Sequence, residues 1–137
     1  EVEEYVHIIQ IEGRTLGDIA RNHVIPTAVK YQNILIDNVK GLKDIFGKDF
    51  KKYASEQLVL IADISERIEA INSGVTTMTN ARKKANSIKD TTKKASVYCN
   101  QVKPLFDDIR YHCDKLELLI DDELWPLAKY RELLFTK

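Results

Sequence analysis

Residues 61–85 read IADISERIEAINSGVTTMTNARKKA, and this stretch decides the fold class. Its apolar residues follow one another at steps of three and four: Ile61, Ile64, Ile68, Ile71, Val75, Met78 and, further on, Ala85. This 3.5-residue spacing places side chains on one stripe of an α-helix and is typical of helices packed nearly side by side. The stretch therefore predicts an all-α fold, and the stripe itself carries no chemistry.

Composition supports this fold class and argues against several kinds of function. The chain has 137 residues, of which 44% are hydrophobic, so it can bury a core. Its 21 Lys and Arg balance its 21 Asp and Glu, which removes the electrostatic argument for a nucleic-acid or polybasic membrane partner. No apolar run is long enough to span a bilayer. We therefore expect neither nucleic acid nor membrane as a partner.

Helical periodicity also covers the residues before this stretch. It predicts two collinear or bent segments, about 3–23 and 26–46, because Pro26 lacks an N–H and clashes with the preceding turn. Gly41 and Gly47 bracket a turn region. Its apolar side chains are expected to plug one end of the fold; they are Leu42, Ile45, Phe46 and Phe50.

The second and third long helices follow from the same pattern. The second is predicted from Asp49 or Ser55 to about Ile88, with a local distortion near Gly74 because glycine weakens a helix interior. The third begins after the capping residues 90–92 and is bent by Pro104. A short final helix starts at Pro126 and runs to about Leu134.

These elements predict an antiparallel helical bundle of three long, partly kinked helices plus a short C-terminal helix. Residues 1–137 are expected to form a single α-helical domain. The chain begins with an amphipathic pattern and without an initiating Met, so we expect an excised piece of a longer protein.

The two cysteines, Cys99 and Cys113, are expected to be buried thiols in a reducing, cytoplasmic protein. Fourteen residues of one helix separate them by roughly 21 Å, which is too far for a disulfide.

The search for reactive or ligand-binding residues predicts no catalytic, cofactor-binding or metal site. Glu4 and His7 form one Glu-x-x-His pair, whereas a di-iron bundle needs this pair twice plus two further glutamates. Neither His23 nor His112 supplies the second pair, and His112 with Cys113 offers only two of the four ligands of a structural zinc. No phosphate-binding glycine loop or nucleophile motif is present.

Two surface features leave alternatives open. A basic cluster between Arg82 and Lys94 is interpreted as a solvated turn, with an intersubunit or ligand contact as the alternative. Its members are Arg82, Lys83, Lys84, Lys89, Lys93 and Lys94. Trp125 and Tyr130 could form an aromatic ligand patch, but such residues more often lock a terminal helix onto its neighbours.

Several stretches carry a family resemblance. They are IIQIEGRTLGDIARNHVIPTAVKYQ (8–32), MTNARKKANSIKD (78–90), YCNQVKPLFDDIRYHCDKLELLIDDELWP (98–126) and DDELWPLAKYRELLF (121–135). Together they resemble the C-terminal helical region of type III glutamine synthetases, the large bacterial form of that enzyme. The resemblance covers nearly the whole chain.

The resemblance implies a parent enzyme that joins ammonia to glutamate through a γ-glutamyl phosphate. It further implies ATP, divalent magnesium or manganese ions, and a double-ring dodecamer for that parent. Catalytic residues of the family lie upstream, so none is transferred to this chain. The expected role is structural, with the catalytic portion of the same polypeptide and neighbouring subunits of a homo-oligomer as partners.

Two other classes of function remain open on the sequence. A free-standing helical adaptor or scaffold would use its apolar stripes to bind partner helices. A metal-carrying bundle enzyme would retain iron, manganese or zinc, which we do not expect here.

Overall fold

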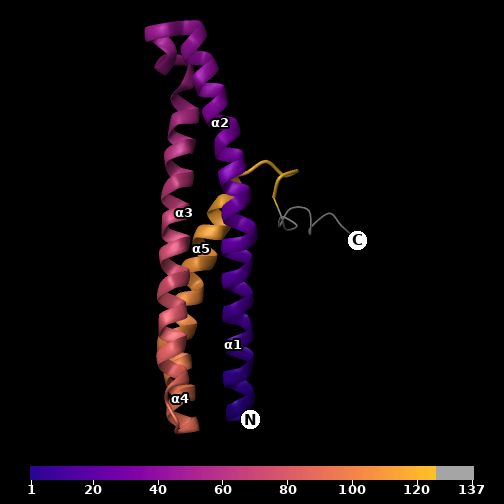
Figure 1. Ribbon diagram of the computed structural model, residues 1–137, viewed down its shortest axis with the longest axis vertical. Coiled ribbons are helices and arrows are strands. Elements are labelled where there is room, and N and C mark those ends of the chain that lie inside the picture. Colours follow the sequence, from indigo (N-terminus) through magenta and orange to yellow (C-terminus); the bar gives the residue numbers. More distant parts are fainter. Residues whose placement is uncertain (126–137) are drawn as a thin grey trace.

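The structure is a computed structural model that describes residues 1–125, and these residues are helical for most of their length (Figure 1). The elements are α1 (Val2–Ile19), the π-helix η1 (Ala20–Val24), α2 (Ile25–Phe46), the 3₁₀-helix η2 (Gly47–Asp49), α3 (Phe50–Asn86), α4 (Thr91–Val97), the π-helix η3 (Tyr98–Val102) and α5 (Lys103–Leu119). No strand occurs within residues 1–125. The all-α prediction is confirmed.

The predicted helix count needs correction. Five α-helices occur between residues 1 and 125, rather than three long helices and a short one. The extra divisions arise because α1 passes into α2, and α4 into α5, through one turn of π-helix. The short helix predicted from Pro126, together with Tyr130, lies outside the described residues.

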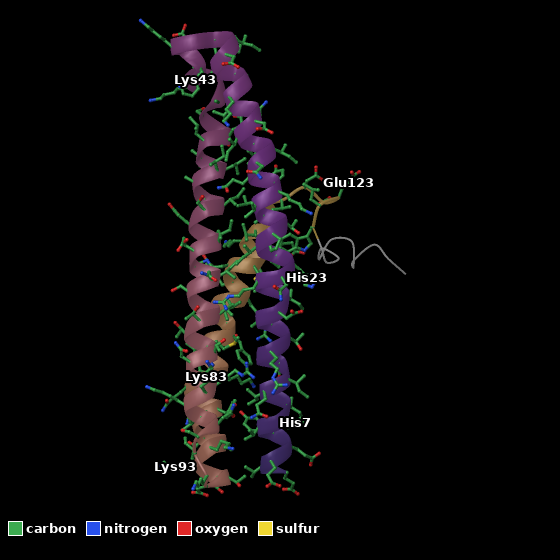
Figure 2. All side chains as sticks on the ribbon, viewed as in Figure 1. His7, His23, Lys43, Lys83, Lys93 and Glu123 are labelled. Carbon is green, nitrogen blue, oxygen red and sulfur yellow. The ribbon has the colours of Figure 1, made fainter. Side chains whose placement is uncertain are left out.

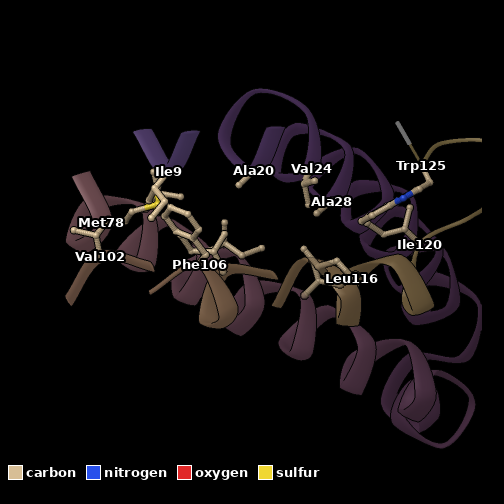
Figure 3. Close-up of a cluster of buried hydrophobic side chains, with 14 of the residues drawn as sticks. Ile9, Ala20, Val24, Ala28, Met78, Val102, Phe106, Leu116, Ile120 and Trp125 are labelled. Atoms are coloured by element: carbon tan, nitrogen blue, oxygen red, sulfur yellow. The ribbon is translucent and has the colours of Figure 1, made fainter. Parts of the chain in front are cut away.

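The elements pack along their lengths. α2 and α3 lie side by side and run in opposite directions, because η2 reverses the chain between them (Figure 1). α5 lies along the lower part of α3, and α1 contacts α4, α5 and α3. Buried side chains from these helices form one hydrophobic cluster, part of which is shown in Figure 3. Its largest fully buried members include Tyr98, Phe106, Ile64, Ile71 and Ile109.

Both helix-interior prolines follow a π-turn. Pro26 removes the N–H that would bond to the Asn22 carbonyl, and the ring would crowd that carbonyl. The wider turn makes room, because the Ile25 N–H donates to the carbonyl of Ala20, five residues back. Thr27 also donates its hydroxyl to the His23 carbonyl, four residues back, at 2.8 Å. The predicted irregularity at Pro26 is confirmed as a π-turn within a continuing helix.

Pro104 repeats this solution. The N–H of Lys103 donates to the carbonyl of Tyr98, again five residues back, and α5 continues from there. The side chains of Tyr98 and Val102 from this turn are completely buried. The π-turn therefore also contributes to the hydrophobic cluster.

The distortion predicted near Gly74 is absent, since α3 is regular from Phe50 to Asn86. A Cβ atom at Gly74 would lie 3.1 Å from Cγ1 of Ile109 on α5. The glycine therefore permits close approach of α5 to α3 and does not mark a break. The missing side chain is a requirement of packing between helices.

The predicted plug at the α2–α3 turn is wrong. α5 ends at Leu119, and α2 and α3 continue past it as a two-helix hairpin (Figure 1). We call residues 36–60 the arm. Because no third helix covers the arm within residues 1–125, Ile45 and Phe46 are 74% and 39% exposed, while Leu42 and Phe50 are half-buried. Gly47 reverses the chain there with φ +58°, a value that favours glycine.

A polar network ties the opposite end of the molecule together. Asn86, at the end of α3, accepts hydrogen bonds on its side-chain oxygen from the Tyr98 hydroxyl and from Gln10 on α1, the latter at 2.8 Å. One amide thus joins three helical segments. No helix within residues 1–125 has the length and apolar content needed to cross a bilayer.

Candidate functional site

The side chains weighed as metal ligands lie apart from one another. Glu4 and His7 are exposed on α1, and His23 is near Asp18, with Nε2 3.9 Å from a carboxylate oxygen (Figure 2). Within residues 1–125, no three His, Cys, Asp or Glu side chains come together as metal ligands could. The prediction that this chain has no catalytic, cofactor or metal residues stays a prediction.

His112 belongs to a polar cluster between α3 and α5. Its Nδ1 lies 3.1 Å from Nη1 of Arg67, and its Nε2 lies 3.6 Å from Asp108. Because a guanidinium only donates, Nδ1 must accept and the proton sits on Nε2, facing Asp108. Arg67 is itself held by Asp63 at 3.2 Å. With each group engaged, the cluster joins two helices and presents no free base.

The cysteines differ in their surroundings, and the prediction that both are buried is wrong for one. Cys99 is exposed, and its hydrogen bond with Tyr5 raises the pKa of that phenol. Cys113 is half-buried, and burial, followed by the charge of Asp114, raises its pKa to about 11. Both are free thiols. Cys113 is accordingly a poor nucleophile at neutral pH.

Trp125 was predicted either to form an aromatic ligand patch or to pack onto neighbouring helices, and the structure shows packing. Its side chain is 9% exposed and belongs to the hydrophobic cluster beside Ile120 (Figure 3). It therefore fastens the segment after α5 onto the helices.

The predicted basic cluster is divided by the structure. Lys83, Lys84, Lys89 and Lys93 are exposed, as a solvated turn requires, and Figure 2 shows Lys83 and Lys93 on the outside of the molecule. Arg82 instead faces α1, and its Nε atom is buried without a hydrogen-bond partner. The interpretation of Arg82 as part of a solvated turn is therefore wrong.

Arg82 lines a groove of about 250 Å³ between α1 and α3, which we call the arginine groove. Its walls are Gly13, Arg14, Gly17, Asp18, Arg21, Asn22, Val75, Met78, Thr79 and Arg82. Three guanidinium groups and one carboxylate thus surround a partly apolar floor. Arginines in this arrangement are the usual protein ligands of carboxylates and phosphates.

Glycines on α1 make room for the groove. A Cβ atom at Gly13 would lie 3.1 Å from Cδ of Arg82 and 3.2 Å from the Phe106 ring. One turn further on, a Cβ atom at Gly17 would lie 3.5 Å from Cε of Met78 and 3.6 Å from Cγ1 of Val75. The missing side chains leave space for the Arg82 stem to lie against α1.

Arg21 is fixed at the other end of the groove by α3. Its Nε donates to Oδ1 of Asn72 at 3.1 Å, and its Nη2 donates to the Asn72 carbonyl and to Thr76 Oγ1 at 3.1 and 2.6 Å. All these acceptors are uncharged. The guanidinium is thus held in place while its charge is not neutralised by a carboxylate within residues 1–125.

Periodicity analysis missed Arg82, although the sequence contained a signal. The apolar ladder of α3 steps by three or four to Met78 and then by seven to Ala85. The omitted rung is position 82, four residues after Met78. A cation on a stripe that is otherwise buried was the sign that this side chain turns inward.

Comparison with known proteins identifies the family. A family model described as the glutamine synthetase C-terminal domain matches residues 1–43. A glutamine synthetase from Bacteroides fragilis (strain YCH46) is 48% identical to this chain, and the match covers 100% of the chain and 19% of the relative. The chain belongs to the glutamine synthetase family, as a C-terminal domain.

More distant relatives extend this result. A type-3 glutamine synthetase from Dictyostelium discoideum is 26% identical over 98% of the chain, and a glutamine synthetase from Butyrivibrio fibrisolvens is 22% identical over the same share. The chain spans 18–19% of the length of these three relatives. Similarity to glutamine synthetases thus extends beyond residues 1–43 to nearly all of the chain.

Proposed function

We propose that this chain is the non-catalytic C-terminal helical domain of a bacterial type III glutamine synthetase, where it serves assembly. The parent reaction would convert ATP, glutamate and ammonia to glutamine, ADP and phosphate, with magnesium or manganese ions in the catalytic portion. The observation that carries the proposal is the match of the whole chain to about a fifth of much longer glutamine synthetases.

Residues 1–137 would form one domain, an antiparallel helical bundle attached to the catalytic portion of the same polypeptide. The proposed setting is a cytoplasmic homo-oligomer, a dodecamer, with neighbouring subunits as further partners. Most of the parent polypeptide is outside this chain, since relatives are about five times as long. A large protein surface is therefore at hand to cover what this domain leaves exposed.

The arm is the part of the domain that we propose makes those contacts. Ile45, Tyr53 and Val59 are 74%, 51% and 66% exposed, and the Phe46 ring stacks on Tyr53 with centroids 4.1 Å apart. Exposed apolar side chains are typical of protein interfaces when they form a patch. Outside the arm, Ile8, Ile34 and Leu118 are exposed as well. Covering them in the assembled enzyme would contribute roughly 25 cal/mol per Å² of apolar surface removed from water.

An activity assay and a deletion test the proposal. The isolated chain should form no glutamine from ATP, glutamate and ammonia, because the family's catalytic residues lie upstream; measurable turnover would overturn the non-catalytic role. Deleting the domain from the parent enzyme should reduce the fraction that sediments as the full oligomer. A fully assembled, fully active deletion variant would overturn the assembly role.

A free-standing adaptor is the alternative function. A synthetase predicts several hundred residues with strand-rich periodicity before Glu1, whereas an adaptor does not. The match of the chain to long glutamine synthetases over 98–100% of its length supports the synthetase.

A further inference from the structure

We propose that the arginine groove between α1 and α3 binds a small oxyanion, a phosphate or carboxylate group, which stabilises the contact between these helices. This site is independent of the arm and of the proposed assembly role.

Arg82 has a buried N–H without an acceptor. Such a group loses its hydration and gains no hydrogen bond, which costs more for a charged group than for a neutral one. Nε of Arg82 is in this state, and no carboxylate within residues 1–125 pairs with its guanidinium. An oxyanion bound to this guanidinium would supply the missing charge, and it would also supply the acceptor for Nε if the side chain turned towards the groove.

The lining of the groove carries a net positive charge. Arg14, Arg21 and Arg82 bring three positive charges, whereas Asp18 is the only carboxylate among the lining residues. Asp18 accepts a hydrogen bond of 2.6 Å from Asn22 and lies 3.9 Å from His23. One carboxylate cannot balance three guanidinium groups, so a bound anion would offset the remaining positive charge.

The guanidinium of Arg21 is held in one orientation by hydrogen bonds to α3. Arg21 uses Nε and Nη2 on Asn72 and Thr76, and within residues 1–125 its Nη1 hydrogens have no acceptor. A guanidinium fixed in this way loses little conformational freedom when it binds an anion.

The groove has room for a small anion. Its volume of about 250 Å³ can hold a phosphate or a short carboxylate. Val75 and Met78 line it but are almost completely buried, so they offer a ligand little surface. A small oxyanion held by the guanidinium groups therefore fits.

Inorganic phosphate and acetate, each titrated against chloride at constant ionic strength, distinguish the two oxyanions. The readouts are the thermal midpoint of the full chain and the ¹⁵N–¹H resonance of Arg82 Nε. We expect at least one of the two anions to raise the midpoint and to shift that resonance with a single saturable binding curve. A response to phosphate alone assigns the site to phosphate groups, and a response to both assigns it to oxyanions in general.

Variants locate the response. Arg82→Met keeps an unbranched apolar stem, and Arg21→Gln keeps the helix; each should weaken binding about tenfold or more, the scale of one lost charge-assisted hydrogen bond. Arg110→Gln is the matched control, since Arg110 lies outside the groove and already pairs with Glu12 and Asp107. Its binding curve should be unchanged.

Three results would overturn the proposal. One is no effect of either anion beyond that of chloride. Another is an equal response in wild type, Arg82→Met and Arg21→Gln. The third is a parent-enzyme structure in which a carboxylate side chain from the catalytic portion fills the groove. Should Arg82→Met not fold, Arg21→Gln and the Arg82 resonance of the wild type still decide the question.

Discussion

The arm and the remainder of the described chain share α2 and α3 but differ in what covers these two helices. In the remainder, which we call the body (residues 1–35 and 61–125), α1 and α5 cover α3, and Ile64, Ile71 and Phe106 are completely buried. In the arm, α2 and α3 face each other alone, and Ala54 is the only completely buried side chain. The apolar pattern is helical in both, so burial depends on the third neighbour.

This contrast separates two roles for apolar residues. The body buries large apolar side chains in its core, and its stability should depend on them. It also exposes some, among them Ile8 and Leu118. The arm has no large side chain that is completely buried, so removing its exposed Ile45 and Val59 should affect the isolated chain little and the assembled enzyme more. Substitutions in the body can therefore be compared with matched substitutions in the arm.

The largest expected effect is on the core of the body. Phe106→Ala should lower the free energy of unfolding by about 3–5 kcal/mol, because the side chain is fully buried and truncation leaves a cavity. Phe46→Ala in the arm should cost under about 1 kcal/mol, since only a stacking contact with Tyr53 is lost. Denaturant unfolding followed by circular dichroism measures both. Equal losses would mean that the arm is as well packed as the body.

The glycines give a second comparison. Gly74→Val should destabilise the chain by about 1–3 kcal/mol, because the new side chain would overlap Ile109. Gly41→Ala, in the arm, should stabilise it by about 0.5–1 kcal/mol, since nothing lies within 4 Å and alanine favours the helix. Thermal unfolding of the two variants distinguishes them. A stabilised Gly74→Val would contradict the close approach of α3 and α5.

The polar contacts of the two regions differ in the same way. Asn86→Ala should cost about 1–2 kcal/mol, because it removes the acceptor of the buried Tyr98 hydroxyl. Asn38→Ala removes an exposed hydrogen bond to Gln57 of 2.9 Å in the arm and should cost under about 0.5 kcal/mol. Native-state hydrogen exchange would report the first change as faster exchange in α1 and η3. Unchanged exchange in α1 and η3 would mean that the hydrogen bonds of Asn86 do not stabilise this end of the molecule.

The smallest expected effect concerns the two thiols. At pH 8, a Cys113 thiol with a pKa of about 11 is ionised in about one molecule in a thousand, so iodoacetamide should modify the exposed Cys99 first. Mass spectrometry of the partly alkylated chain reports the order. Modification of Cys113 before Cys99 would contradict the burial assigned to it.

The same thiol predicts a pH dependence. Burial raises the folded-state pKa above the unfolded value of about 8.5, so its contribution to stability is complete below that value and is lost as the pH rises towards 11. Cys113→Ala should therefore lose less stability over this range than the wild type. A steeper loss in the variant would reverse the sign of the argument.

How far the sequence predicted this fold depends on whether a residue interacts within its helix or with a neighbour. The stripe from Ile61 to Met78 predicted α3 closely, because helix periodicity is a local property. The distortion at Gly74 and the burial of Ile45 were mispredicted. The conformation at Gly74 depends on how closely α5 approaches α3, and the exposure of Ile45 depends on where α5 ends, at Leu119. The candidate site was missed for the same reason: Arg82 is a groove residue only because Gly13 lies opposite it.

If the arm is a contact surface of the assembled enzyme, charges placed on it should disrupt the assembly. Ile45→Glu with Val59→Glu places two charges on side chains that are 74% and 66% exposed. Analytical ultracentrifugation of the parent enzyme should then show loss of the full oligomer, while the isolated chain keeps its thermal midpoint within about 2 °C. A parent enzyme that carries both charges and sediments as the intact oligomer would contradict the account.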